Sequence, residues 1–266
     1  MILGGYRTKF MKKTEKFFSR FNPNVPIIIT NHQTAEMIKY TNNSFLATKI
    51  SFINQIANIC QQIPDTNIDD IAATIGLDPR IGKLFLNAGP GYGGSCLPKD
   101  IKAIINLSSK LGVNSTLLTA VEKINKQQIG SIIELIKQNI GKINGEKIAV
   151  LGIAFKPETD DIRDSTSVEL VNRLVKLGGK ISIHDPRAIE NARKIFHDKV
   201  KYLKSVSGAV KDCNCAIIMT AWNEYKKINN ETIKHMNTKF IIDSRRIISN
   251  KNLNAKYFAI GLSQKL

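Results

Sequence analysis

The second half of the chain alternates apolar runs with helical patterns, and this alternation limits the possible folds more than any other feature. The apolar runs lie at residues 147–155, 215–220 and 240–243, and a further strand is expected at 180–185. Their composition is typical of strands that are buried on both faces, as in parallel sheets. Parallel strands that alternate with helices build a doubly wound α/β domain, whose ligands bind beyond the carboxyl ends of the strands. We therefore expect a Rossmann-like α/β domain over residues 143–266.

A helical pattern dominates the first half of the chain. Its longest stretch is 34–62, where Thr34 is the expected N-cap. The apolar residues of this stretch recur every three or four positions, at Leu46, Ile50, Ile53, Ala57 and Cys60. Lys39 and Asn43 lie four residues apart and share another face, which simple solvation of two polar residues explains equally well. Together with a second helical pattern further along, this predicts a central helical domain over residues 31–142.

Inside the helical half lies a glycine-rich stretch with one cysteine, Ala-Gly-Pro-Gly-Tyr-Gly-Gly-Ser-Cys-Leu-Pro-Lys-Asp at residues 88–100. Glycine allows positive φ and a close approach of the backbone to a ligand. Pro98 suits the first turn of a helix, so Cys96 is expected at a helix N-terminus beside Lys99, where both features stabilise a thiolate. The alternative is a buried cysteine in a loop, but a glycine cluster followed by Pro-Lys-Asp favours a functional thiol.

Composition excludes several classes of protein. Lys and Arg outnumber Asp and Glu by 39 to 22, for a formal net charge of +17, yet the lysines are scattered and no nucleic-acid-binding motif is present. No apolar stretch approaches the roughly 18 residues of a transmembrane helix, and the N-terminus lacks the apolar core of a signal peptide. The four cysteines fit neither a zinc site nor a disulfide framework. We expect a cytoplasmic protein without a metal that binds neither nucleic acid nor membranes.

Three motif blocks resemble the nucleotide-sugar 6-dehydrogenases, the family of the UDP-glucose and GDP-mannose dehydrogenases. The sequence Gly-Tyr-Gly-Gly-Ser-Cys-Leu-Pro-Lys-Asp at 91–100 looks like the catalytic cysteine signature of that family. A second block lies in the long helix at 35–50 and a third at 152–165, in the order that the family has. The resemblance covers nearly the whole chain and implies an NAD-dependent, four-electron oxidation of UDP-glucose to UDP-glucuronate.

The resemblance assigns catalytic roles to four residues. Cys96 would attack the intermediate aldehyde to give a thiohemiacetal, and oxidation of this adduct would leave a thioester. Lys39 and Asn43 would face the reacting carbon of the sugar and donate hydrogen bonds to the developing oxyanion. Asp100, one helical turn after Cys96, would be the base for the water that releases the acid.

The resemblance also implies how the substrate is held. Lys156 and Arg245 would bind the nucleotide sugar together with the loop 85–94. The candidates in that loop are Phe85, Leu86, Asn87, Tyr92 and Gly93. Arg80 would reach the substrate of the neighbouring subunit, so the chain would form a homodimer through the 34–62 helix.

The largest departure from the family concerns NAD. In the family an N-terminal Rossmann domain that binds NAD precedes the long helix, and residues 1–30 are interpreted here as a remnant of that domain. Arg163 is the residue expected to approach the cofactor. We therefore expect oxidation of UDP-glucose only when an NAD-binding half completes the site. Two alternatives stay open, namely a GDP-mannose 6-dehydrogenase, which shares Gly-Gly-Ser-Cys-Leu-Pro-Lys-Asp, and an inactive module that binds a UDP-sugar and dimerises.

Overall fold

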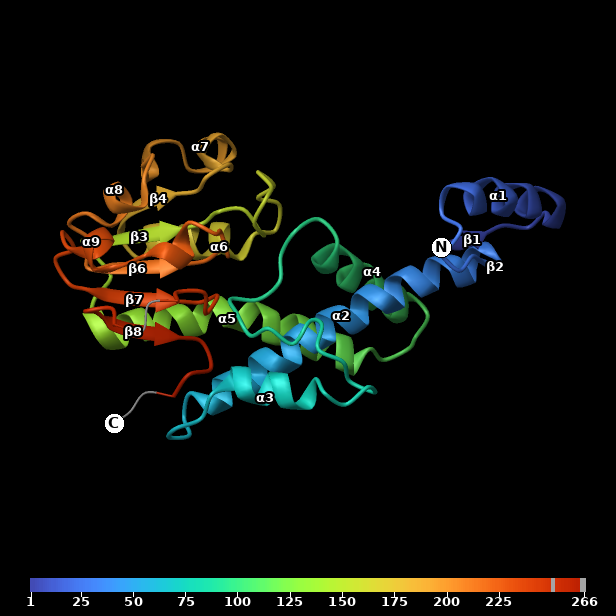
Figure 1. Cartoon of the computed structure of the whole chain (residues 1–266), viewed down its shortest axis with the longest axis horizontal. Coiled ribbons are helices and arrows are strands. Elements are labelled where there is room, and N and C mark those ends of the chain that lie inside the picture. Colours follow the sequence, from blue (N-terminus) through green and yellow to red (C-terminus); the bar gives the residue numbers. More distant parts are fainter. Residues whose placement is uncertain (250–251, 264–266) are drawn as a thin grey trace.

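The protein is elongated and has three parts in a row (Figure 1). The computed structural model describes residues 1–249 and 252–263. A small N-terminal unit lies at one end, four helices occupy the middle, and a parallel sheet with its covering helices forms the other end. None of the described helices is both long enough and apolar enough to cross a membrane.

The N-terminal unit consists of a strand, a helix and a strand. β1 (Ile2–Gly4) pairs in parallel with β2 (Ile28–Thr30), and α1 (Thr8–Phe21) connects them. A two-stranded sheet of this size is marginal without further packing. Gly4 lies directly on the following long helix, because a Cβ added at Gly4 would be 2.6 Å from the Cβ of Ala35. The unit therefore packs on the start of that helix.

The middle part contains α2 (His32–Cys60), α3 (Ile68–Ile75), α4 (Leu97–Lys110) and α5 (Thr116–Ile140). The predicted long helix is confirmed as α2, but the prediction that Thr34 is its N-cap is wrong. Asn31 is the N-cap, and its side-chain oxygen accepts a hydrogen bond of 2.8 Å from the backbone N–H of Thr34. An asparagine at this position satisfies a free N–H of the first turn, so the helix begins two residues earlier than the apolar pattern indicates.

The predicted doubly wound α/β fold is confirmed in the second half. Six parallel strands have the order β5-β4-β3-β6-β7-β8. The strands are β3 (Lys147–Leu151), β4 (Lys180–His184), β5 (Lys201–Tyr202), β6 (Cys215–Ile218), β7 (Phe240–Asp243) and β8 (Lys256–Ala259). The helices between them are α6 (Thr166–Lys176), α7 (Ile189–Phe196), α8 (Val206–Val210) and α9 (Asn230–Ile233), with short 3₁₀ turns at His197–Lys199 and Tyr225–Lys227. The strand order reverses between β3 and β6, which is where such folds bind ligands.

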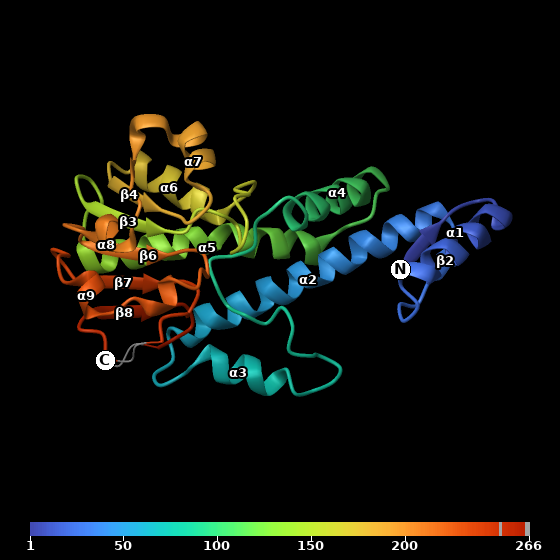
Figure 2. The ribbon, with the colours of Figure 1, turned by 45° about the horizontal axis from the view of Figure 1, so that its top comes forward.

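One apolar core continues from the helices into the sheet. It includes Ile53 of α2, Ile68 of α3 and Ile132 of α5 together with the buried residues of β3 and β6. Figure 2 shows that α5 extends from beside α2 to the sheet. The carboxyl ends of the strands point toward the loop between α3 and α4 (Figure 1), so the core holds that loop over the ligand-binding edge of the sheet.

His184, at the carboxyl end of β4, gives the fold a predicted acid sensitivity. It is 4% exposed, and its Nδ1 lies 3.0 Å from the hydroxyl of Tyr225. Burial lowers the pKa of His184, although Glu224 and Asp185 oppose this shift. The unfolded chain takes up a proton near the ordinary histidine pKa of about 6.5, whereas the folded state resists it. The free energy of unfolding should therefore decrease as the pH falls below about 6.5.

Urea unfolding at pH 7.5 and pH 5.5 measures this effect. Replacing His184 with glutamine should reduce the loss of stability between the two pH values. Replacing the exposed His235 with glutamine should not. Equal pH dependence of the His184→Gln variant and the native protein would contradict the assignment.

Candidate active site

The glycine-rich loop packs closely against the segment that follows β3. Gly94 has φ +85°, and a Cβ at this position would lie 2.7 Å from the ring of Phe155. A Cβ on Gly93 would lie 2.3 Å from the backbone oxygen of Asp164. The N–H of Gly94 donates to the oxygen of Arg163 over 3.0 Å. The absence of side chains at these glycines thus permits the backbone contact that joins the cysteine loop to the sheet domain.

The loop ends at Cys96, which the structure places at the start of α4 as the sequence predicted. Cys96 is the N-cap residue, and proline follows in the first turn. Its thiol is exposed, whereas Cys60, Cys213 and Cys215 are buried. Arg163 lies near this thiol. The pKa of Arg163 is raised mainly by its hydrogen bonds to Asp161 and, to a lesser degree, by the charge of Cys96.

Three further predicted residues meet one helical turn from Cys96. Asp100 is 1% exposed, and its N–H donates to the oxygen of Cys96 over 3.0 Å. The side-chain amide of Asn43 donates to Asp100 Oδ2 over 2.6 Å, and Lys39 Nζ lies 3.2 Å from the same oxygen. The side chain of Lys39 is 55% exposed. The face that Lys39 and Asn43 share on α2 is thus turned toward α4, and a buried carboxylate fixes both.

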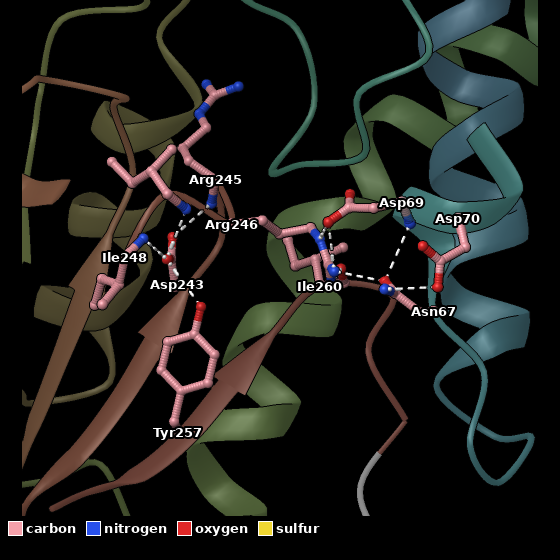
Figure 3. Close-up of polar contacts among 10 residues, drawn as sticks. Asn67, Asp69, Asp70, Asp243, Arg245, Arg246, Ile248, Tyr257 and Ile260 are labelled. Carbon is pink, nitrogen blue, oxygen red and sulfur yellow. Dashed lines mark hydrogen bonds and ion pairs between the residues drawn. The ribbon is translucent and has the colours of Figure 1, made fainter. Parts of the chain in front are cut away.

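Arg245 lies at the carboxyl edge of the sheet, and only part of its guanidinium is hydrogen-bonded. Its Nε donates to the oxygen of Met219 over 2.7 Å. Within the part of the chain that the structure describes, its two Nη groups donate no hydrogen bond. Figure 3 shows the guanidinium pointing away from Asp243. Burial lowers the pKa of Arg245 to about 10. A half-buried cation with free donors is suited to an anionic ligand.

Arg245 is positioned by a buried carboxylate. Asp243 is fully buried, and its Oδ1 accepts from the N–H of Arg245 over 3.1 Å. Its Oδ2 accepts from the N–H groups of Ile247 and Ile248, each over 2.8 Å, and from the Tyr257 hydroxyl over 3.0 Å (Figure 3). This network fixes the backbone turn after β7 independently of the arginine side chain.

Four Asp-x-Arg triplets share this turn, in which the N–H of the arginine donates to the aspartate two residues earlier. The pairs are Asp78–Arg80, Asp161–Arg163, Asp185–Arg187 and Asp243–Arg245. In the first two pairs the guanidinium also binds the same carboxylate. In the last two pairs backbone N–H groups occupy the carboxylate, so the guanidinium is free to bind elsewhere. Arg187 binds Glu158 over 2.6 Å, and Arg245 retains free donors.

The remaining predicted substrate residues lie in different environments. Lys156 is exposed, with Nζ 5.4 Å from the ring centre of Phe155, beside the cysteine loop. Phe85 has φ +65° and is 39% exposed, and Asn87 is exposed. Arg80 projects from the surface with its side chain 87% exposed and paired with Asp78. These residues are accessible to a ligand or to a second subunit.

Three predicted residues of the loop offer mainly backbone or buried groups. Leu86 is 3% exposed and belongs to the main core. Tyr92 is 7% exposed and packs in a smaller cluster with Ala47 and Ile101, and burial raises its pKa to about 12. Its hydroxyl has no hydrogen-bond partner among the described residues. Gly93 has no side chain. The side chains of Leu86 and Tyr92 are therefore buried, whereas Cys96 is exposed.

Two residues that sequence reasoning missed hold the site together. The side-chain oxygen of Asn54, buried in α2, accepts from the N–H of Gly89 over 2.7 Å. Asp185 follows β4 directly, and its Oδ2 accepts from the N–H groups of Ile153 and Ala154 over 2.7 and 3.0 Å. The sequence offered one signal for each residue. Asn54 is a polar residue on the buried face of an amphipathic helix, and Asp185 is a carboxylate at the end of a predicted strand.

The spacing Gly-x-Gly-x-x-Gly occurs once, at Gly89, Gly91 and Gly94. In a dinucleotide-binding fold this pattern follows a strand and opens a helix. Here it follows no strand, and its backbone binds Asn54 and Arg163 instead. These glycines serve the cysteine loop. Within residues 1–249 and 252–263, no group of His, Cys, Asp and Glu side chains is arranged to hold a metal ion.

The close packing of Gly94 leads to a stability prediction. Gly94→Ala should lower the free energy of unfolding by about 2–4 kcal/mol, because alanine is strained at positive φ and its Cβ overlaps the ring of Phe155. Gly112→Ala is the matched control, since Gly112 has φ +70° with nothing within 4 Å of an added Cβ. The control should cost only about 1 kcal/mol. Equal urea midpoints for the two variants would show that the loop is not held by this contact.

Comparison with known proteins agrees with this geometry. Residues 33–127 match the central domain of the UDP-glucose/GDP-mannose dehydrogenase family, and residues 149–250 match the UDP binding domain of the same family. Both matches lie inside the predicted central and C-terminal domains, whose boundaries stay predictions.

Individual relatives give the same result. A UDP-glucose 6-dehydrogenase of Rickettsia felis is 43% identical over 88% of this chain and 53% of its own length. The UDP-glucose 6-dehydrogenase TuaD of Bacillus subtilis is 39% identical over 98% of this chain and 57% of its own length. The structure of a UDP-glucose dehydrogenase from Pyrobaculum islandicum superimposes with a TM-score of 0.90 at 30% identity, over 98% of this chain and 58% of that one. The chain spans about half the length of the curated relatives it matches, and it belongs to the UDP-glucose/GDP-mannose dehydrogenase family.

Proposed function

We propose that the chain carries the thiol site and the nucleotide-sugar site of a UDP-glucose 6-dehydrogenase. The observation that carries this proposal is the position of the exposed Cys96, one helical turn from the Lys39–Asn43–Asp100 cluster and beside the sheet edge that presents Arg245. The names of the relatives supply the substrate class. The proposed reaction oxidises the C6 alcohol of UDP-glucose in two steps to UDP-glucuronate.

The chemistry assigns a separate task to each group. The first step removes a hydride and a proton from the alcohol and leaves an aldehyde. The Cys96 thiolate adds to the aldehyde carbon, and Lys39 and Asn43 donate to the oxyanion that forms. Loss of a second hydride from this thiohemiacetal gives a thioester. Water, deprotonated by Asp100, then attacks the thioester carbon, and the thiolate of Cys96 leaves.

The cofactor that this reaction requires is NAD, which when bound would accept one hydride per molecule, so the two oxidation steps would use two molecules of NAD. Arg163 fits an anionic group of such a molecule, because its side chain is 71% exposed and lies near Cys96. The Nε and Nη2 groups of its guanidinium donate to the carboxylate of Asp161 over 2.9 and 2.7 Å. Arg163 would thereby position a phosphate group of the cofactor near the site of oxidation.

Calorimetric titration of the chain with UDP-glucose and, separately, with GDP-mannose tests the substrate assignment. Heat of binding with UDP-glucose alone is the expected result. Binding of GDP-mannose alone would overturn the assignment in favour of a GDP-mannose 6-dehydrogenase. Binding of neither nucleotide sugar would overturn the proposal that this chain holds the complete nucleotide-sugar site.

We further propose that the chain forms a homodimer through α2. Phe45, Phe52 and Ile59 are 63%, 49% and 50% exposed and lie seven residues apart, so they form one apolar stripe along the helix. Lines of exposed apolar side chains of this kind are typical of helix–helix interfaces. A dimer of this type would also bring the exposed Arg80 within reach of a second subunit.

Replacing both Phe45 and Phe52 with glutamate should convert the dimer to a monomer, because four carboxylates would be buried together in the interface without partners. Light scattering after size exclusion measures the mass directly. Leu177→Glu is the control, since Leu177 is 39% exposed on the sheet domain, away from α2. A dimeric Phe45→Glu/Phe52→Glu variant would exclude this stripe as the interface.

A further inference from the structure

A cavity of about 450 Å³ opens at the amino ends of β3, β4 and β5, on the opposite edge of the sheet from Arg245. β3 is five residues long, so the two edges are about 16 Å apart. Five lysines and two aspartates, Asp198 and Asp212, line this cavity. The lysines are Lys147, Lys180, Lys199, Lys201 and Lys211. This cavity is therefore separate from the proposed active site and carries an excess of positive charge.

The strand register places three of these lysines on one face of the sheet. Lys147 of β3 is directly opposite Lys180 of β4, and Lys201 of β5 is opposite Ser182, two residues after Lys180. Residues opposite one another in register, and residues two apart along a strand, point to the same side. Like charges directly opposite each other destabilise a sheet. Repulsion between these lysines therefore destabilises the free protein, and a bound anion would remove this repulsion.

The lysines lack the partners that would neutralise them. None of the five makes an ion pair with any residue in the described ranges, 1–249 and 252–263, although lysines elsewhere do. Lys126, Lys137 and Lys234 each pair with a glutamate three or four residues away, at 2.7 to 2.8 Å. The cavity lysines are thus available to an external ligand.

The rest of the lining is apolar or weakly polar. Ile181, Val200 and Leu203 supply apolar surface, and Ser182 supplies a hydroxyl. Cavities of roughly 300–1,000 Å³ with apolar walls and a few charged groups are typical of small-molecule sites. A Lys ammonium is a compact charge that suits phosphate oxygens.

We propose that this amino-edge cavity binds a small molecule with two or more linked phosphate groups. The phosphates would lie across Lys147, Lys180 and Lys201, and an attached nucleoside would rest on the apolar wall. The site is not a second copy of the nucleotide-sugar site, because it lies at the opposite strand ends and uses neither Cys96 nor Arg245.

Calorimetric titration with sodium tripolyphosphate and with ATP tests the proposal in the native protein and in three variants. Lys180→Gln/Lys201→Gln should weaken binding of both probes at least tenfold. This variant should still fold, because it leaves Lys147 of β3 opposite a neutral glutamine and so removes a repulsion between like charges. Lys12→Gln/Lys16→Gln on α1 removes the same charge from exposed positions elsewhere and should bind as the native protein does. Arg245→Ala removes the guanidinium at the other edge, so the binding of the probes that this variant retains belongs to the amino-edge cavity.

The outcomes separate the possibilities. Tighter binding of ATP than of tripolyphosphate supports a nucleotide ligand, and equal binding supports recognition of the phosphates alone. Equal weakening by the two lysine pairs would overturn the proposal, since net charge would then explain the affinity. Loss of binding in Arg245→Ala with retention in Lys180→Gln/Lys201→Gln would place the anion at the carboxyl edge and overturn it. Absence of binding by either probe at low salt would also overturn it.

Discussion

Iodoacetamide at pH 8 should alkylate Cys96 at least about 100-fold faster than any other cysteine of the folded protein. Cys96 is exposed at the start of α4, whereas Cys60, Cys213 and Cys215 are buried. Alkylation requires the thiolate. Burial raises the pKa of Cys213 to about 11, so only about one thiol in a thousand is ionised at pH 8. The buried thiols must also wait for local unfolding before the reagent reaches them.

Mass spectrometry of peptides from a time course of labelling measures all four rates at once. Cys96→Ser should leave a folded protein that incorporates almost no label before unfolding. Cys60→Ser, which removes a buried thiol instead, should label at the native rate. Comparable rates for Cys96 and Cys213 in the folded state would contradict the exposed position of Cys96.

The same experiment links the thiol to the proposed substrate site. Saturating UDP-glucose should slow the alkylation of Cys96, because a sugar placed for attack by the thiolate covers it. Glucose without the nucleotide should give little protection, since it lacks the diphosphate that Lys156 and Arg245 would hold. If the protein binds UDP-glucose but the rate of Cys96 alkylation does not change, the sugar lies away from Cys96.

Much of the fold could be predicted because strong patterns mark it. The apolar runs that became β3, β6 and β7 are continuous, and the sheet buries them on both faces. β4 was also predicted, although its sequence, Lys-Ile-Ser-Ile-His, alternates polar and apolar residues. β5 and β8 were not predicted. β5 has two residues, and β8, Lys-Tyr-Phe-Ala, is partly exposed at an edge. Edge strands carry a weaker apolar signal because only part of their surface is covered.

The candidate site was predictable in part for a similar reason. Helical spacing brought Lys39 and Asn43 to one face, and a proline-containing helix start placed Cys96 at the beginning of α4. The partners of Asn54 and Asp185 are backbone N–H groups of distant loops, and no local pattern encodes such contacts. The direction of each arginine in the four Asp-x-Arg turns was equally hidden, because it depends on which groups occupy the aspartate.

Arg245→Ala should weaken binding of UDP-glucose at least about 30-fold. Loss of one member of a half-buried, hydrogen-bonded charge pair costs about 2–5 kcal/mol, and each 1.4 kcal/mol corresponds to a factor of ten in affinity. The fold should survive the change. Asp243 keeps all of its hydrogen bonds, because its donors are backbone N–H groups and the Tyr257 hydroxyl. The structural loss is the 2.7 Å bond to the oxygen of Met219.

Two further variants make this calorimetric result specific. Arg193→Ala removes the same charge from the opposite side of the sheet domain, where Arg193 stacks 4.3 Å from the ring centre of Tyr202, and should leave the affinity unchanged. Arg245→Lys keeps the charge but not the planar fork of donors, so its affinity should lie between those of the native protein and Arg245→Ala. If Arg245→Ala binds UDP-glucose as tightly as Arg193→Ala does, the free donors of Arg245 do not face the substrate. The nucleotide would then have to be held by the cysteine loop and Lys156 alone.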